Sequence, residues 1–277
     1  MPGLAVDAED GVEVTLYYED VGSGRPVLLV PGWPLSQRAW DQQVRPFVAA
    51  GRRVVSYDRR GSGRSTHSWT GYDYDTFAAD LAGLLDRLDL RDVALVGFSS
   101  GCGDIARYIR RYGTDRIAEL VFLSAPPVCS DAPDRFAASD LVDTLVVASI
   151  QHRIPMLDEV LRRFFSVDGV LTVDEPTRQF HLRQAASASA KATTDSIAAS
   201  GSVDFARDLA GVDRPTLVVH GAGDAVAPFA ESGRRIAAAV PGSQVVLIPD
   251  APHAAPITHF EQCNAAVLEF LGAGPAA

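Results

Sequence analysis

The chain has 277 residues, of which 25 are Lys or Arg and 35 are Asp or Glu, and its formal net charge is −10. This acidic balance argues against nucleic acid and anionic membranes as partners, because both bind to cationic surfaces. Hydrophobic residues make up 47% of the chain and charged residues 22%, which is typical of a soluble globular protein. Lys191 is the only lysine in the sequence, so a mechanism that needs a lysine nucleophile has a single candidate.

The sequence carries no visible targeting signal. Residues 1–11 contain no apolar run, so neither a secretory signal nor a transit peptide is expected. No stretch approaches the ~20 apolar residues of a membrane span, and we therefore expect a cytoplasmic protein. Cys102, Cys129 and Cys263 are widely spaced and predict no disulfide framework. Whether identical chains form a homo-oligomer is left open by the sequence.

Short apolar runs and helical segments alternate along the chain. The runs are bounded by Gly, Pro or Asp and predict strands buried on both faces of a parallel sheet, at 27–30, 54–57, 93–96, 120–123, 216–219 and 245–248. Helical spacing between them predicts helices at about 37–49, 74–88, 102–112, 230–240 and 257–271. Residues 12–18 alternate apolar and polar side chains and predict an antiparallel edge strand. The alternation predicts an α/β fold with a mostly parallel sheet flanked by helices.

The alternation stops in the middle of the chain. Residues 128–212 contain no convincing buried strand, and the segments 140–149 and 157–165 look helical. We therefore predict a helical cap at 128–212, inserted into a core made of residues 1–127 and 213–277.

The sequence Gly97-Phe98-Ser99-Ser100-Gly101 directly follows a predicted strand and precedes a predicted helix. A serine in such a sharp strand-to-helix turn needs small neighbours, and its hydroxyl then stands clear of the sheet. This context predicts Ser99 as a nucleophile. The alternative is an ordinary tight turn in which Ser99 only caps the helix.

A serine hydroxyl needs a base to take its proton. His253 follows the last predicted strand, at the sheet edge where α/β proteins place their sites, and is the predicted base. His220 ends a strand and is expected to make a structural hydrogen bond. The other histidines are expected on the surface or in packing roles, and none has metal-ligand spacing: His67, His152, His181 and His259.

The base needs an acid that holds its imidazole in the correct tautomer. Asp224 follows the strand before His253 and is the predicted acid, which gives the chain order serine, acid, histidine that is expected for this architecture. Asp250 is nearer to His253 in the sequence but is interpreted as a turn residue. Asp58 is expected to brace a loop by pairing with a nearby arginine.

The negative oxygen that forms during attack needs fixed N–H donors. One predicted donor is the amide of Ser100, which follows the nucleophile. The other is the amide of Trp33 in Pro31-Gly32-Trp33-Pro34, because Trp33 keeps an N–H that its flanking prolines lack.

The sequence also contains Gly101-Cys102-Gly103-Asp104-Ile105-Ala106, which matches a dinucleotide-binding pattern. Its first glycine stands five residues beyond Val96, however, and already enters the helix. Close helix packing explains these small residues better, and we predict neither a cofactor nor a metal.

Four segments carry a family resemblance: 31–36, 58–65, 97–103 and 106–109. They resemble the α/β-hydrolase superfamily, and within it the cofactor-free haloperoxidase, perhydrolase and arylesterase branch. The resemblance implies esterase-type acyl transfer, in which hydrogen peroxide sometimes replaces water. It implies a triad of Ser99, Asp224 and His253, with oxyanion-hole amides from Trp33 and Ser100.

Three positions depart from the family pattern. Pro31 stands where a histidine is usual, Ser62 where histidine is common, and Cys102 where glycine is frequent. The first hypothesis is a serine hydrolase that acts on an ester, thioester or lactone. The second, motivated by Pro31, is a non-hydrolytic biosynthetic enzyme (cyclase, lyase or dehydratase) that reuses the fold and its histidine base. The third is a non-catalytic receptor that retains the triad in a binding pocket.

The substrate is expected to be a small apolar molecule. Five aromatic or flexible apolar side chains are the candidates for the pocket wall: Phe98, Phe136, Met156, Phe164 and Phe165. The alternative for the four in the cap is that they are core residues on a helical face.

Overall fold

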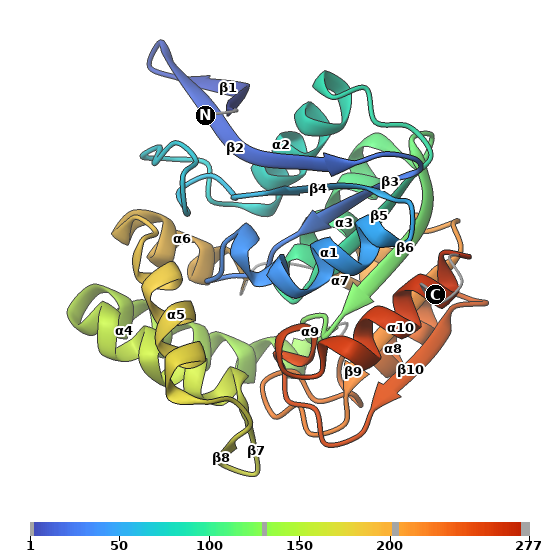
Figure 1. The fold of residues 1–277 in the computed structure, drawn as a ribbon. Coiled ribbons are helices and arrows are strands. Elements are labelled where there is room, and N and C mark those ends of the chain that lie inside the picture. Colours follow the sequence, from blue (N-terminus) through green and yellow to red (C-terminus); the bar gives the residue numbers. More distant parts are fainter. Residues whose placement is uncertain (1–2, 129–131, 201–204, 273–277) are drawn as a thin grey trace.

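The computed structural model describes residues 3–128, 132–200 and 205–272, and between 132 and 139 it describes the backbone alone. Eight strands form the central sheet: β1 (Gly3–Glu9), β2 (Val12–Gly22), β3 (Pro26–Val30), β4 (Arg53–Tyr57), β5 (Val93–Phe98), β6 (Ile117–Leu123), β9 (Thr216–Gly221) and β10 (Gln244–Ile248). Their order is β1-β2-β4-β3-β5-β6-β9-β10 (Figure 1). All six strands predicted from apolar runs are confirmed.

The strands from β4 to β10 in the sheet are parallel, and β1 and β2 are antiparallel additions. The prediction of an edge strand at 12–18 was wrong in one respect. This segment is part of β2, which is antiparallel as expected but lies between β1 and β4. The edge strand is β1, which was not predicted from the sequence because it contains Asp7 and Glu9 and its residues are mostly exposed or half-buried.

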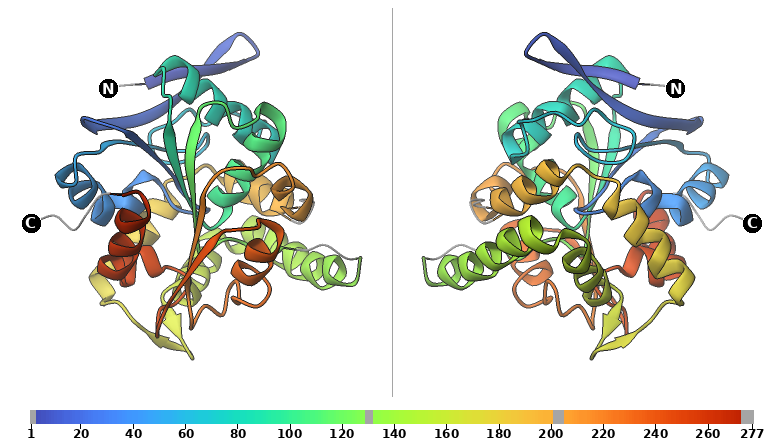
Figure 2. Two further views of the ribbon diagram at one scale, coloured as in Figure 1. Left: turned by 90° about the vertical axis from the view of Figure 1, so that its right-hand side faces the viewer. Right: turned by 90° about the vertical axis from the view of Figure 1, so that its left-hand side faces the viewer.

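Helices cover both faces of the twisted sheet (Figure 2). One face carries η1 (Gln37–Trp40), α1 (Asp41–Ala49), α9 (Ala255–Thr258) and α10 (Phe260–Phe270). The other carries α2 (Tyr74–Arg87), α3 (Ser100–Tyr112), α7 (Phe205–Leu209) and α8 (Gly233–Ala239). Alternate residues of β3 enter opposite layers, since Val27 and Leu29 join the first apolar cluster and Leu28 and Val30 the second. The middle of the sheet is therefore buried on both faces, as its continuous apolar runs predict. The run at 245–248 is an exception, because it forms the edge strand β10, in which Val245 and Leu247 are exposed.

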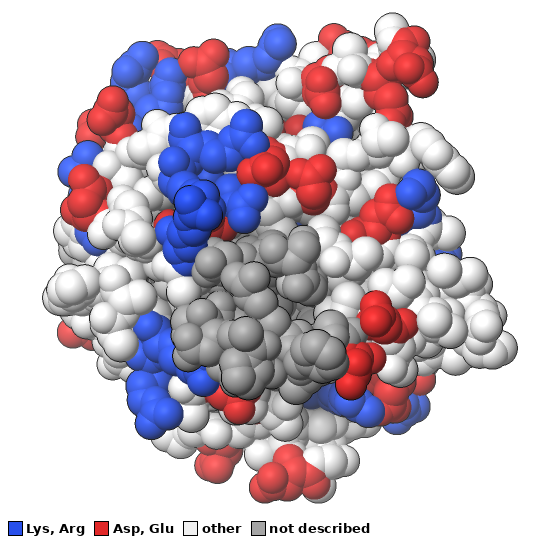
Figure 3. All heavy atoms as spheres, turned by 180° about the vertical axis from the view of Figure 1, so that it is seen from behind, with Lys and Arg blue, Asp and Glu red and all other residues white. Residues whose placement is uncertain are grey.

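Acidic and basic side chains lie next to each other on the face seen in Figure 3. In α3, Arg107, Arg110 and Arg111 pair with Asp75 or Asp208 at N–O distances of 2.7–2.9 Å. These cations are thus held in ion pairs. No helix within the described ranges has the length and hydropathy needed to cross a membrane.

Between β6 and β9 the chain forms α4 (Ala132–Phe164), β7 (Ser166–Val167), β8 (Val170–Leu171), α5 (Glu175–Ala186), α6 (Ala190–Ser200) and α7. The helices α4, α5 and α6 pack together beside the sheet edge (Figure 1). The two predicted helical segments lie on either side of a kink in α4 at His152, whose backbone is not helical. Two details differ from expectation: β7 and β8 form a short hairpin, and α7 packs against α3.

The fold places its functional loops at one edge of the sheet. The loops after β3, β4, β5, β9 and β10 all leave the carboxyl ends of parallel strands and therefore meet there. These loops contain the candidate residues from Trp33 to His253.

Candidate active site

Ser99 lies in the turn between β5 and α3, with φ 51° and ψ −125°. This conformation is sparsely populated by residues with a Cβ and costs about 1–3 kcal/mol. Its glycine neighbours leave no room for a side chain. A Cβ on Gly97 would lie 2.9 Å from the Cys102 nitrogen, and one on Gly101 would lie 2.5 Å from the Val30 carbonyl oxygen. The turn thus explains why glycines flank Ser99 at a distance of two residues.

Ser99, His253 and Asp224 come together in one chain of hydrogen bonds. Ser99 Oγ lies 2.9 Å from His253 Nε2, and His253 Nδ1 lies 2.8 Å from Asp224 Oδ2. The three residues are buried, with exposed fractions of 8%, 1% and 5%. Nucleophile, base and acid therefore have the geometry that serine acyl transfer needs.

The Asp224 carboxylate is fixed on both oxygens. Oδ1 accepts hydrogen bonds from the amides of Val226 and Ala227 at 2.9 and 2.8 Å, while Oδ2 faces His253. Burial raises the pKa of this carboxyl, but His253, the side chain of His220 and the Ala227 amide outweigh burial and hold the pKa well below its usual value. The Asp224 carboxyl group is thus ionised when His253 acts as a base.

His220 makes the structural hydrogen bond that was expected of it. Its Nε2 lies 2.7 Å from the Ala227 carbonyl oxygen and 3.3 Å from Asp224 Oδ2. Asp250 has φ 55° and is exposed, in agreement with its interpretation as a turn residue. Asp58 was expected to brace a loop by pairing with an arginine, and the predicted partner was wrong. Its carboxylate braces two loops through the backbone amides of Gln37 and Arg64, at 2.9 and 2.8 Å, not through a guanidinium group.

Two aromatic rings hold the imidazole of His253. The ring of Phe164 meets it edge-on with centroids 4.5 Å apart, and the ring of Phe98 lies 5.5 Å away. Phe98 is only 1% exposed and also contacts Trp40. It therefore supports the base from behind and does not line the cavity, so its prediction as a pocket residue was wrong.

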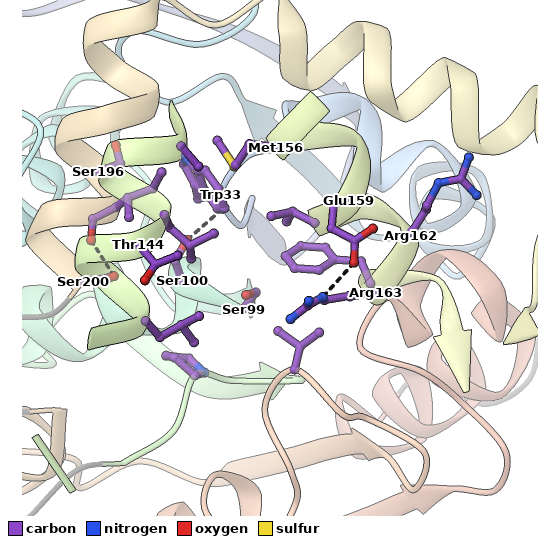
Figure 4. Close-up of a pocket in the computed structure, with 18 of the residues that line it drawn as sticks. Trp33, Ser99, Ser100, Thr144, Met156, Glu159, Arg162, Arg163, Ser196 and Ser200 are labelled. Carbon is purple, nitrogen blue, oxygen red and sulfur yellow. Dashed lines mark hydrogen bonds and ion pairs between the residues drawn. The ribbon is translucent and has the colours of Figure 1, made fainter. Parts of the chain in front are cut away.

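Of the two predicted oxyanion donors, the Trp33 amide already has a hydrogen-bond partner inside the protein. The Trp33 amide donates a hydrogen bond of 2.7 Å to Ser100 Oγ (Figure 4). Arg59 Nη1 donates to the same oxygen at 3.3 Å. The structure thus adds the Ser100 hydroxyl and Arg59 to this corner of the site, where the sequence had predicted only the backbone amides of Trp33 and Ser100.

A cavity of about 950 Å³ opens above Ser99. Apolar side chains from the cap, the oxyanion loop and the loop after β9 form most of its wall, among them Trp33, Leu145, Met156, Val160, Phe164, Ile197 and Val226. Met156 and Phe164, two of the candidates for the pocket wall, are among these residues. Phe165, the first residue after α4, is fully buried and packs against His181, so it does not line the cavity. The side chain of Phe136 lies outside the described residues.

Polar groups occupy two parts of the cavity wall. Thr144, Ser196 and Ser200 lie on one side of Ser99, and the ion pair between Glu159 and Arg163 lies on the other (Figure 4). Arg163 is 67% exposed, so this pair lies where the cavity meets solvent. Ser100 and Arg59 are polar groups beside the nucleophile, and apolar side chains form most of the remaining wall.

No cluster of three or more His, Cys, Asp or Glu suited to a metal ion occurs within residues 3–128, 132–200 and 205–272. Arg59, Tyr74 and Phe77 line the cavity but were not predicted as site residues. The position of Arg59, two residues beyond the carboxyl end of β4, was the signal that could have identified it.

Comparison with known proteins agrees with this geometry. Residues 25–260 match the family described as alpha/beta hydrolase fold. The chain is 39% identical to the non-heme chloroperoxidase CPO-A1 of Kitasatospora aureofaciens, over 95% of this chain and 97% of that protein. It is 34% identical to the bifunctional esterase/perhydrolase DCH of Acinetobacter calcoaceticus, over 96% and 98%.

A solved structure shows the same likeness. The bromoperoxidase from Bacillus anthracis superposes with a TM-score of 0.92 at 42% identity, covering 98% of this chain and 99% of that one. The resemblance to the haloperoxidase and esterase branch is therefore confirmed. The chain is an enzyme that belongs to the alpha/beta hydrolase fold family.

Proposed function

We propose that the protein is a serine hydrolase that cleaves carboxylic esters, thioesters or lactones through an acyl-enzyme on Ser99. One observation carries the proposal: Ser99, His253 and Asp224 form an unbroken line of hydrogen bonds of 2.9 and 2.8 Å beneath an apolar cavity.

The reaction follows from the different roles of the two imidazole nitrogens of His253. With its Nδ1 proton held by Asp224, His253 presents an unprotonated Nε2 to the Ser99 hydroxyl and takes its proton as Oγ attacks the carbonyl carbon. The protonated imidazole then gives that proton to the leaving alcohol, thiol or ring oxygen. His253 next activates a water molecule, which releases the acid and restores Ser99.

Hydrogen peroxide is a second acceptor for the acyl group. Its attack on the acyl-enzyme would give a peracid in place of the acid, with the same proton transfers through His253. The relative named as an esterase/perhydrolase supports this extension.

The cavity supports an apolar substrate. Its volume of about 950 Å³ lies at the upper end of the range for small-molecule sites, and apolar side chains form most of its wall. A bulky apolar acid or alcohol group would fill it, and burial of such a group would contribute about 25 cal/mol per Å² of apolar surface.

The test compares two serine variants on a small aryl ester such as 4-nitrophenyl acetate. Ser99→Ala is expected to lower kcat at least about 10³-fold. Ser187→Ala, an exposed position in the cap, is expected to retain the wild-type rate. Turnover by Ser99→Ala at the wild-type rate would refute the proposal.

A fluorophosphonate probe separates the proposal from the non-hydrolytic alternative. Covalent labelling at Ser99 is expected, because the probe needs a nucleophilic serine paired with a base. A folded protein that stays unlabelled and hydrolyses no ester would favour a reaction in which His253 acts as base without an acyl-enzyme.

A further inference from the structure

The side chain of Ser100 lies at the cavity wall, between the Trp33 amide and Arg59. Ser100 is the first residue of α3 and lines the cavity beside Ser99. Its hydroxyl oxygen accepts two hydrogen bonds, one from the Trp33 amide at 2.7 Å and one from Arg59 Nη1 at 3.3 Å. The Trp33 amide thus has a partner inside the protein before any substrate enters.

A hydroxyl group has two lone pairs and one proton. Trp33 and Arg59 occupy both lone pairs of Ser100 Oγ, so the proton is the group that remains to be donated. Within the part of the chain that the structure describes, this hydroxyl donates no hydrogen bond. Since Ser100 borders the cavity, the natural acceptor is an atom of a bound substrate.

Arg59 is held firmly behind this hydroxyl. Its Nη2 donates to Asp104 Oδ1 at 2.9 Å, and its guanidinium carbon lies 3.8 Å from the centre of the Phe77 ring. The side chains of Arg59 and Asp104 are 6% and 0% exposed. A cation that donates to a hydroxyl oxygen draws electrons from the O–H bond and makes that proton a stronger donor.

We infer that the Ser100 hydroxyl is a donor of the oxyanion hole, through which the Trp33 amide and Arg59 act on the negative oxygen of the tetrahedral intermediate. The Ser100 amide, which as the first helical N–H has no carbonyl one turn back, donates beside it. The inference rests on the proposed acyl transfer at Ser99. In this arrangement Ser100 contacts the substrate, while Arg59 is a positioning residue.

If the Ser100 hydroxyl hindered the reaction, its removal would change kcat in the opposite direction. If Ser100 Oγ only blocked the Trp33 amide, its removal would free that amide for the substrate and raise the rate. If it donates to the oxyanion, its removal lowers the rate. The sign of the change in kcat therefore decides between the two roles.

The test uses a matched pair of variants. Ser100→Thr keeps the hydroxyl. Ser100→Val gives a side chain of nearly the same shape as threonine but without the hydroxyl. We expect kcat for 4-nitrophenyl acetate to fall by about 10- to 100-fold in Ser100→Val relative to Ser100→Thr, with KM changed less than about threefold. Ser100→Ala adds no atoms to the turn, so it serves as the test if the variants with branched side chains fold poorly. Its kcat is expected to fall by a similar factor relative to the wild-type protein.

Inhibition by phenylboronic acid gives an independent readout, because its tetrahedral adduct on a serine places an oxygen in the oxyanion hole. Its inhibition constant is expected to rise in Ser100→Val by a factor similar to the loss of kcat. Equal or higher kcat in Ser100→Val and Ser100→Ala, with wild-type protein labelled at Ser99, would overturn this inference and leave the proposed function standing. Wild-type protein that is neither labelled nor active would overturn both.

Discussion

Replacement of Asp224 by Asn tests how the acid controls the base. In the wild-type protein Oδ1 accepts two backbone amides, from Val226 and Ala227, and Oδ2 faces His253 Nδ1 at 2.8 Å. An asparagine must place its carbonyl oxygen against the two amides, because its NH₂ group cannot accept their protons. The NH₂ group then faces His253 Nδ1.

This forced orientation reverses the tautomer of the imidazole. His253 Nδ1 must accept from the asparagine, so the ring proton moves to Nε2 and points at Ser99 Oγ, 2.9 Å away. A protonated Nε2 cannot take the proton of the nucleophile. Substitutions of this kind cost about 10⁴ in kcat, which at 1.36 kcal/mol per decade is a barrier increase of about 5.4 kcal/mol.

The assay is kcat for 4-nitrophenyl acetate at pH 7, with Asp250→Asn as the control. Asp250 is exposed, lies three residues from His253 and has a positive φ that asparagine tolerates, so the control is expected to keep full activity. An Asp224→Asn protein with the wild-type unfolding temperature and kcat within about tenfold of wild type would refute the reasoning.

Three further predictions concern the surroundings of the triad. Gly101→Ala places a Cβ 2.5 Å from the Val30 carbonyl oxygen, so we expect urea unfolding to show a loss of about 1–3 kcal/mol and kcat to fall, and no change in either would contradict the packing argument. Phe164→Ala removes a buried ring 4.5 Å from that of His253 and should lower the free energy of unfolding by about 3–5 kcal/mol; a loss below about 1 kcal/mol would contradict this. Burial raises the pKa of Asp104 to about 7, so the folded protein binds an extra proton between about pH 4 and 7 and this residue's contribution to stability falls as pH rises through that range. In the wild-type protein this contribution to the free energy of unfolding should fall by up to about 1.4 kcal/mol per pH unit, and urea unfolding of Asp104→Asn should lack the fall. Parallel plots of the free energy of unfolding against pH for the two proteins would contradict the assignment.

The parts of the fold that are buried on both faces could be predicted from the sequence. The runs at 93–96 and 216–219 are continuous and apolar because helices cover both sides of the sheet, and runs this short and apolar strongly favour buried parallel strands. The strand β1 could not be found in this way, since it is held by pairing with β2 and carries acidic side chains. The β7–β8 hairpin did leave a turn signal, Asp168-Gly169, both residues of which have positive φ.

The triad could be predicted because each member follows a recognisable strand, and strand ends fix where a side chain emerges. The hydroxyl of Ser100 was missed for a different reason. Its role depends on Trp33 and Arg59, which lie 67 and 41 positions away in the chain and meet it only in the folded protein. The cap was equally difficult, because Phe164 and Phe165 are both apolar, and only the tertiary packing at the end of α4 decides that Phe164 lines the cavity and Phe165 does not. The cap boundaries and the cytoplasmic location stay predictions, and the state of assembly stays open.

The acyl-enzyme on Ser99 is the central claim, and intact-mass spectrometry of acid-quenched protein measures it directly. Within the first turnovers of 4-nitrophenyl acetate, the wild-type protein should gain about 42 Da for one acetyl group on the hydroxyl that His253 activates. Peptide mapping should place the group on Ser99, and the Ser99→Ala protein should gain no mass. Turnover with no adduct at any quench time in either the wild-type or the slow Asp224→Asn protein, or an adduct on another residue, would contradict the account.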